Sequence, residues 1–196
     1  MIAIIGHGPS LRGSRLGEYI DSFKYVIRFP YLKNWQTPID YGVKTSFVCS
    51  PNGGKIRRIR QERPELGYYL WDKHPGSMVS PMQCRMLGIE KYEDVSRLIQ
   101  KWAKKLPKAT PNLSTGTAGI LIAAAKLGEP ITAFGCDHLK LGKDMSKNYV
   151  GSWLYEGRMA TWRNIQNKCT HSLSHDRELI NVIEKKYNVT VDWKHT

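Results

Sequence analysis

The segment that decides the fold is residues 2–29, IAIIGHGPSLRGSRLGEYIDSFKYVIRF. It begins with an apolar run at residues 3–5, which has no polar alternation and is therefore typical of a strand buried on both faces in a parallel sheet. A turn with two glycines follows, and residues 25–27 form a second apolar strand. A nucleotide-binding α/β domain begins with a strand, a glycine turn and a further strand in this order.

The turn at residues 6–10 has the sequence GHGPS. Its two glycines allow the backbone to turn tightly and a ligand to approach closely, while Pro9 fixes one dihedral angle and Ser10 can cap the segment after it. The turn fits phosphate or nucleotide binding, and it fits a purely structural role equally well. A dinucleotide-binding fingerprint needs a third glycine where Leu11 stands, so the sequence disfavours an NAD enzyme.

Apolar runs and turn residues divide the rest of the chain into further strands and helices. We expect strands at residues 45–49, 67–71, 131–134 and 189–191, a loop at 72–81, and helices at 95–105, after the turn at 114–116 and after Ser174 as N-cap. Because helices alternate with buried strands, we predict a doubly wound α/β fold with a mostly parallel sheet. The ligand is then expected at the carboxyl ends of the strands.

Composition sets the outer limits. The chain has 196 residues and a formal net charge of +13, which favour one domain over residues 1–196 and a polyanionic partner such as nucleic acid, anionic glycolipid or a membrane surface. No window holds the ~20 uninterrupted apolar residues of a transmembrane segment, so we expect a soluble, cytoplasmic protein. The four cysteines are widely spaced and support neither a zinc site nor a disulfide framework.

A second informative stretch is PNLSTGTAGILIAAAKLGEPITAFGCD, residues 111–137. It places a Ser-Thr-Gly turn at the start of an apolar helix that leads into a buried strand. The amino end of a helix offers free amides and a positive dipole, which suit a phosphate or carboxylate, and Ser114 and Thr115 add hydroxyl groups. A small-residue helix that only packs on a sheet fits the same stretch.

These two stretches, in this order, resemble the motifs of sialyltransferases. Residues 6–29 resemble the large sialyl motif, a G-N-(S/G)-x-x-L element followed by G-S, I-D and V-I-R, and the GxGPS form is similar to that of the bacterial members. Residues 114–137 resemble the small sialyl motif, S-(S/T)-G followed by an apolar helix and a strand that ends in G-x-D. The resemblance implies a Rossmann-like, GT-A-like glycosyltransferase fold, a CMP-activated sugar as donor and no further cofactor.

The residues expected to bind the donor lie in these motifs and at the strand ends between them. They are Gly6, His7, Gly8, Pro9, Ser10, Arg28, Ser50, Ser114, Thr115, Gly116 and Asp137. The chain departs from the family pattern at two positions, because Pro30 and Ser50 stand where sialyltransferases place asparagines. The identity of the transferred sugar therefore stays open.

A third segment, HSLSHD at residues 171–176, resembles the H-S-x-x-x-D segment that carries the general base of the bacterial sialyltransferases. The resemblance gives this role to His171, and His175 competes for it. The position suits a base, because the positive end of the following helix disfavours imidazolium and leaves a neutral imidazole to accept a proton.

Residues 138–152 are polar and without evident secondary structure, which is typical of a lid loop. In the bacterial enzymes the corresponding loop supplies tyrosines to the leaving phosphate, so the resemblance assigns this role to Tyr149 first and Tyr155 second. No D-x-D metal motif occurs in the chain. We therefore expect a metal-independent, inverting transfer in which hydroxyls, amides and cations stabilise the leaving anion.

The acceptor is less constrained. Residues 55–108 match no motif and are expected to form an acceptor-side insertion that carries much of the excess charge. A glycan hydroxyl and the hydroxyl of a hydroxymethylated base in phage DNA both suit a basic transferase, placed in a bacterial or a phage-infected host cytoplasm. A non-catalytic nucleotide- or DNA-binding module is the alternative from a different class. The oligomeric state stays open.

Overall fold

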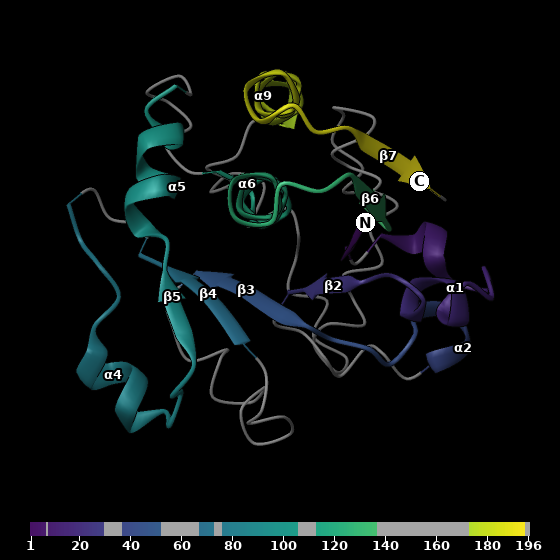
Figure 1. Ribbon diagram of the computed structural model, residues 1–196, viewed down its shortest axis with the longest axis horizontal. Coiled ribbons are helices and arrows are strands. Elements are labelled where there is room, and N and C mark those ends of the chain that lie inside the picture. Colours follow the sequence, from purple (N-terminus) through teal and green to yellow (C-terminus); the bar gives the residue numbers. More distant parts are fainter. Residues whose placement is uncertain are drawn as a thin grey trace, which may run out of the picture.

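The computed structural model describes residues 1–6, 8–29, 37–51, 67–72, 76–105, 113–136 and 173–194, which form an α/β fold (Figure 1). One sheet of these residues has the strand order β5-β4-β3-β2-β1-β6-β7, and each pairing is parallel. The strands are β1 (Ile2–Ile5), β2 (Tyr25–Arg28), β3 (Phe47–Pro51), β4 (Gly67–Trp71), β5 (Tyr92–Asp94), β6 (Ile131–Phe134) and β7 (Val191–Lys194).

Strand β1 lies inside the sheet, and the later strands are added on both sides of it. Strands β2 to β5 follow one another on one side of β1, whereas β6 and β7 lie on the other side. The predicted doubly wound, parallel arrangement is therefore confirmed, and its switch point lies between β1 and β6. Ligands of open α/β sheets bind at such a switch point, outside the carboxyl ends of the strands.

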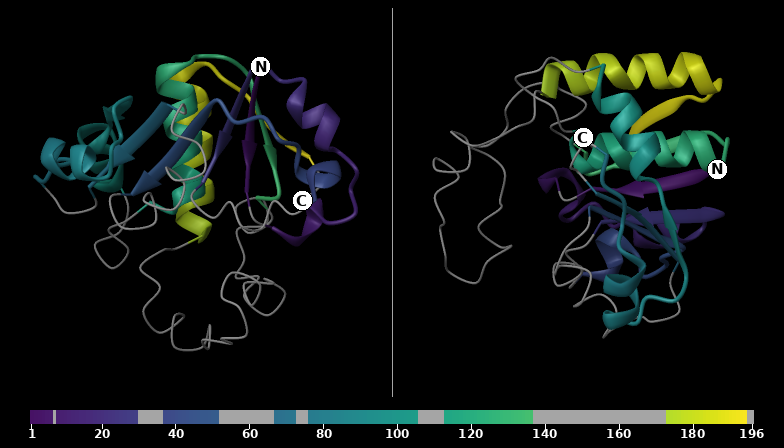
Figure 2. Two further views of the ribbon diagram at one scale, coloured as in Figure 1. Left: turned by 90° about the horizontal axis from the view of Figure 1, so that it is seen from below. Right: turned by 90° about the vertical axis from the view of Figure 1, so that its left-hand side faces the viewer.

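Helices cover both faces of the sheet (Figures 1 and 2). One face carries α5 (Ser96–Ala103), α6 (Thr115–Lys126) and α9 (Leu173–Tyr187); the other carries the 3-10 turn η1 (Pro9–Leu11), α1 (Gly17–Asp21), α2 (Pro38–Tyr41) and α4 (Pro81–Met86). None of the described helices is long and apolar enough to cross a bilayer.

The central strands are buried on both faces, as the apolar runs predict. Ile2 and Ile4 of β1 belong to a core shared with α5, α6 and α9. Ala3 and Ile5, which point the other way, pack with residues of α1 and α2. Gly119 lets α6 lie close to the sheet, because a Cβ added there would come within 2.7 Å of the Phe29 ring.

Several predicted boundaries differ from the structure by one to three residues, and the starts of β3, β7 and α9 are the informative ones. Strand β3 begins at residue 47 instead of 45, because Ser46 bonds to Val26 through both its amide and its hydroxyl before the ladder starts. Strand β7 begins at residue 191 instead of 189, because the Val189 amide still donates to a carbonyl of α9. Helix α9 begins at Leu173, so Ser174 lies inside its first turn and is not the residue before it.

The sequence did not predict β5 or α4. Strand β5 has the sequence YED and lies at the edge of the sheet, so it lacks the apolar run that marks a central strand. Helix α4 has six residues, which is too short for a helical pattern to emerge. Strands β4 and β5 lie within the range 55–108 and extend the sheet; the role of that range toward an acceptor stays a prediction.

Candidate functional site at the switch point

The carboxyl ends of β1 and β6 meet closely at the switch point. The Gly6 amide donates to the Phe134 carbonyl at 2.8 Å, and the Gly8 amide donates to the Gly135 carbonyl at 2.6 Å. A Cβ added to Gly6 would lie 2.3 Å from the Gly135 carbonyl oxygen and 2.9 Å from Cys136 Sγ. Gly6 is therefore required by the approach of the two strands, and its contact with a ligand stays a prediction.

Leu11 explains why the glycine turn departs from the dinucleotide fingerprint. Its side chain is fully buried. It lies under the turn after β6, where a Cβ added to Gly135 would come within 2.9 Å of Leu11 Cδ1. Gly135 also has a φ of +59°, a conformation that favours glycine. Leu11 is thus a core residue of the switch point, and Ser10 beside it is half-buried.

The amino end of α6 lies at the same edge of the sheet, because α6 runs back and leads by a short turn into the parallel strand β6. Ser114 caps this helix: its hydroxyl accepts the Thr117 amide at 3.2 Å and lies 2.9 Å from Thr117 Oγ1. The predicted helix start is confirmed. Since the Ser114 hydroxyl has partners within the protein, the Thr115 and Gly116 amides, which have no acceptor within the helix, are the groups suited to an anion.

Asp176, in the first turn of α9, packs against this helix end. Its side chain is 1% exposed, and its Oδ2 accepts the Ser114 amide at 3.3 Å. The hydroxyl groups of Ser114 and Thr117 lie near enough to the carboxyl group to lower its pKa, whereas Oδ1 has no hydrogen-bond partner among the described residues. Burial raises the pKa of Asp176 to about 6, although the hydrogen bonds and the charge of His175 act in the opposite direction.

Two other predicted donor residues have structural contacts. Arg28 is fully buried; its Nη2 donates to the Tyr41 carbonyl at 2.7 Å and its Nε to the Lys44 carbonyl at 2.9 Å. Ser50 is also fully buried, and its hydroxyl donates to the Pro51 carbonyl at 2.8 Å. The Arg28 contacts join β2 to residues 41–44, whereas the Ser50 bond stays within β3. A contact of either side chain with a donor stays a prediction.

Several predicted site residues lie outside the described ranges: His7, Asp137, Tyr149, Tyr155, His171 and the proposed lid at 138–152. The side chain of Pro9 is also not described. The structure therefore brings together Gly6, Gly8, Ser114, Thr115 and Gly116 at one edge of the sheet. Within the described residues, no group of three or more His, Cys, Asp and Glu side chains is arranged to hold a metal ion.

Asp176 is the site residue whose role the sequence did not reveal. It was visible as an acid in the first turn of the last helix and as the final residue of the H-S-x-x-x-D segment. An acid there is ordinarily explained by the helix dipole alone. The contact with Ser114 joins residues far apart in the chain, so no local pattern predicts it.

The chain matches no protein-family profile and no curated protein. It is similar to the crystal structure of a mammalian sialyltransferase, with 13% sequence identity and a TM-score of 0.51 over 97% of this chain and 67% of that one. This chain has a sialyltransferase-like fold. A mammalian sialyltransferase in complex with Gal-beta-1-3GalNAc-ortho-nitrophenol is also similar, with 12% identity and a TM-score of 0.47 over 97% of this chain and 68% of that one.

The sialyltransferase-like fold confirms the fold that the two motif-like segments imply. Residues 6–8 follow β1, residues 135–136 follow β6, and residues 114–116 begin α6. All three segments lie at the carboxyl edge of the sheet, at or beside its switch point. The arrangement offers backbone amides from a helix end and close backbone approach at a glycine turn, both of which suit a phosphorylated ligand.

Proposed function

We propose that the protein is a glycosyltransferase that takes a sugar from a CMP-activated donor and transfers it, without a metal ion, to a hydroxyl group of a glycan or of a modified base in DNA. One observation carries the proposal: the glycine turn after β1 and the amino end of α6 lie at the switch-point edge of a sialyltransferase-like fold. This is the edge at which α/β sheets bind their ligands.

The proposed donor site is built mainly from backbone. The Thr115 and Gly116 amides bind the donor phosphate, and the dipole of α6 adds attraction for its negative charge. A turn with Gly6 and Gly8 leaves room for the donor to approach the backbone. Such contacts recognise the phosphate and not the sugar, so they are consistent with donors other than CMP-sialic acid.

The proposed transfer inverts the anomeric carbon. His171 takes the proton of the acceptor hydroxyl as that oxygen attacks the anomeric carbon. The bond from this carbon to the phosphate oxygen breaks, and CMP leaves as an anion. Tyr149 and Tyr155 donate hydrogen bonds to the leaving phosphate and offset its developing charge.

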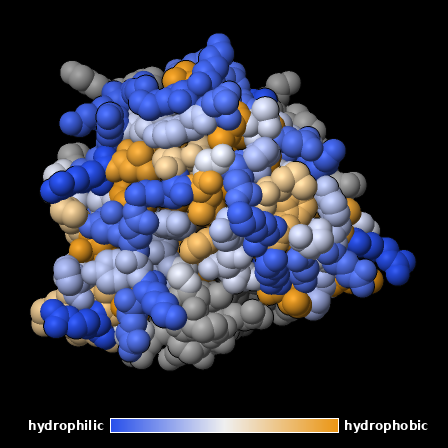
Figure 3. Space-filling model, in the orientation of Figure 1, coloured by the Kyte–Doolittle hydropathy of each residue, from blue (hydrophilic) through white to orange (hydrophobic). Residues whose placement is uncertain are grey.

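Lysines also gather at the carboxyl ends of α5 and α9. These ends lie at the amino edge of the sheet, opposite the proposed donor site, so the surface suits a polyanion but does not itself place an acceptor at that site. Lys101, Lys104 and Lys105 lie at the end of α5, and Lys185 and Lys186 at the end of α9; none of the five forms an ion pair within the described residues. Figure 3 shows mainly hydrophilic side chains over these two helices. The Lys105 and Lys186 ammonium groups lie 4.1 and 5.7 Å from the Trp102 ring, so the two helix ends form one basic surface.

The first experiment is thermal unfolding with CMP, UMP, GMP, AMP or NAD, each with and without EDTA. A ligand that binds only the folded state stabilises it by mass action and so raises Tm. At a ligand concentration of 100 times Kd, the free energy of unfolding rises by about 2.7 kcal/mol. The proposal expects CMP alone to raise Tm, and EDTA to change nothing. Stabilisation by UMP only with metal, or by no nucleotide, would contradict the proposed donor.

Two histidine variants separate catalysis from binding. His171→Ala should keep the CMP effect on Tm and abolish hydrolysis of a CMP-sugar, whereas His175→Ala should keep both. Full activity of His171→Ala would show that His171 is not the general base. Acceptor binding measured from 50 to 200 mM salt then separates the acceptor classes, because counterion release makes nucleic-acid affinity fall steeply with salt.

A further inference from the structure

We propose that Asp176 is a positioning residue: its carboxylate holds the first turn of α9 against the amino end of α6 and so keeps the Thr115 and Gly116 amides in place for a nucleotide phosphate. The ligand in this statement rests on the proposed function. The tie between the two helices, by which we mean the hydrogen bond from the Ser114 amide to Asp176, does not rest on the proposed function, and it is testable without any ligand.

The geometry places one carboxylate at the amino ends of two helices. Asp176 belongs to the first turn of the 15-residue helix α9, and its Oδ2 accepts the amide of Ser114, the N-cap of the 12-residue helix α6. The positive ends of both helix dipoles therefore face the same negative charge. Since Ser114 immediately precedes Thr115, a shift of Asp176 would move the free amides directly.

The hydroxyl groups of α6 depend on the same carboxylate. Ser114 Oγ and Thr117 Oγ1 lie 2.9 Å apart, and either one is able to donate to the other. Both hydroxyl groups also favour the ionised form of the Asp176 carboxyl and so lower its pKa. An ionised carboxylate only accepts, so it favours the arrangement in which one hydroxyl donates toward it and the other hydroxyl donates to the first, while the Ser114 oxygen accepts the Thr117 amide. The cap of α6 is thus organised by a residue of α9.

The energetic cost of this arrangement argues for a functional role. Oδ1 of Asp176 is buried and has no hydrogen-bond partner in the described part of the chain. A buried, half-satisfied carboxylate lowers stability near neutral pH, where an uncharged side chain of the same size would not. Ionisable groups retained at such a cost concentrate at functional sites.

The charges around Asp176 define the pH range of the tie. From α9, His175 acts on it through its charge; from α6, only the hydroxyls and amide of Ser114 and Thr117 face it among the described contacts. The pKa of Asp176 is raised to about 6 by burial. The carboxylate is therefore ionised and accepts fully above that pH, and the tie weakens below it.

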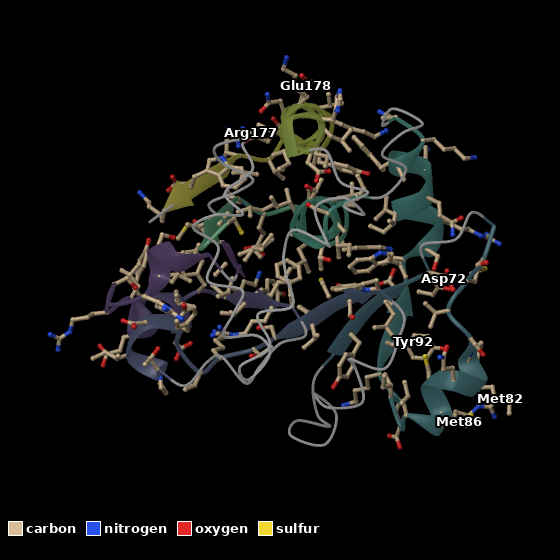
Figure 4. All side chains as sticks on the ribbon, turned by 180° about the vertical axis from the view of Figure 1, so that it is seen from behind. Asp72, Met82, Met86, Tyr92, Arg177 and Glu178 are labelled. Atoms are coloured by element: carbon tan, nitrogen blue, oxygen red, sulfur yellow. The ribbon has the colours of Figure 1, made fainter. Side chains whose placement is uncertain are left out.

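The test combines amide hydrogen exchange of Ser114 and Thr117, whose amides have acceptors, with titration of CMP, in the wild type, Asp176→Ala, Asp176→Asn and Glu178→Ala. Glu178 is the matched control, because it lies in the same part of α9 but on its exposed outer side (Figure 4). At pH 7.5 we expect Asp176→Ala to speed exchange and to weaken CMP binding, each by about tenfold, as for the loss of a charge-assisted hydrogen bond.

Asp176→Asn supplies the conservative rescue. Its amide oxygen still accepts from Ser114, so exchange and CMP affinity at pH 7.5 should return to within about threefold of the wild type. The change in CMP affinity that the wild type shows between pH 5 and 7 should be reduced in this variant, because its side chain does not titrate.

Each outcome decides the proposal. Wild-type exchange and CMP affinity in Asp176→Ala would show that Asp176 only packs, and would overturn it. If Asp176→Ala does not fold, the Asn variant decides, because an unchanged pH dependence there also overturns the proposal. If the wild type binds no CMP, the proposed function fails, and faster exchange in Asp176→Ala but not in Glu178→Ala still supports the tie.

Discussion

Two buried carboxylates, Asp40 and Asp176, show how differently two corners of this fold treat a negative charge. Asp40 is 6% exposed and Asp176 is 1% exposed. Asp40 accepts the Gly13 and Arg15 amides at 2.8 and 2.9 Å, one on each oxygen, and these bonds lower its pKa. Asp176 accepts one amide at 3.3 Å, its other oxygen has no partner among the described residues, and burial raises its pKa.

The difference shows that hydrogen bonds, and not burial alone, set the sign of the pKa shift. The corner of Asp40 joins α1, α2 and the turn after η1, and it lies beside Arg28, whose guanidinium is held by carbonyls. That corner contributes stability at neutral pH. The junction of α6 and α9 around Asp176 instead lowers stability at the edge where the proposed ligand binds.

Removal of Arg28 should have the largest effect. Arg28→Ala deletes a fully buried cation, leaves the Tyr41 and Lys44 carbonyls without their donor, and opens a cavity. We expect a loss of about 4 kcal/mol in the free energy of unfolding, measured in urea at pH 7.5. Arg28→Lys should recover less than half of this, because one ammonium group cannot reproduce the guanidinium fork. A loss below about 1 kcal/mol would contradict a structural role for this corner.

The pH dependence of stability should show the second largest effect. The pKa of Asp176 in the folded state, about 6, lies above its ordinary value of 3.8, so the folded protein binds more protons between these pH values. The contribution of Asp176 is therefore fully present below pH 4 and is lost as pH rises through 6, by at most about 3 kcal/mol. Subtracting the unfolding free energies of Asp176→Asn from those of the wild type, from pH 4 to 7.5, measures it; a flat difference would refute the assignment.

Asp40 should give a smaller effect of the opposite sign. Its pKa is lowered in the folded state, so its contribution is present above its unfolded pKa and is lost as pH falls through the folded value. Asp40→Asn should destabilise the protein by about 1–2 kcal/mol at pH 7.5, because one of two charge-assisted bonds is lost. Thermal unfolding down to pH 3 should show that the difference in stability between Asp40→Asn and the wild type becomes smaller as pH falls. A difference that grows would mean that the pKa of Asp40 is not lowered in the folded protein.

Glu178 should show almost no effect. It lies two residues after Asp176 in the same helix, but its side chain is exposed. Glu178→Gln should change the free energy of unfolding by less than about 0.5 kcal/mol at every pH tested, as for most surface substitutions. A larger change would mean that the charge at the start of α9 matters more than the burial of Asp176.

The fold was predictable where sequence patterns are strong. The strands β1, β2 and β6 appear as apolar runs because they are buried on both faces, and α6 is marked by its cap Ser114 and by small apolar residues. Strand β5 escaped prediction because an edge strand with the sequence YED lacks such a run. Local patterns thus identify the interior of the sheet better than its edge.

The backbone positions of the candidate site were predictable from the sequence, but the hydrogen-bond partners of its charged side chains were not. The glycine turn and the start of α6 follow from local sequence. Arg28 was expected at a donor, and the structure directs its guanidinium to the Tyr41 and Lys44 carbonyls. Asp176 had no predicted role beyond its place in the H-S-x-x-x-D segment, and the structure pairs it with Ser114. Both destinations depend on residues brought together only by the folded chain.

The pairing of β1 with β6 also has a consequence for how the chain is synthesised. Strand β1 leaves the ribosome well before β6, yet Ile2 to Ile5 pair on one side with residues 131–134. Until then, one edge of β1 has unpaired amides and carbonyls, including the Gly6 amide that finally donates to Phe134. A nascent chain that ends before β6 therefore exposes the edge of an entirely apolar strand, the kind of surface that chaperones shield and that aggregates when they do not.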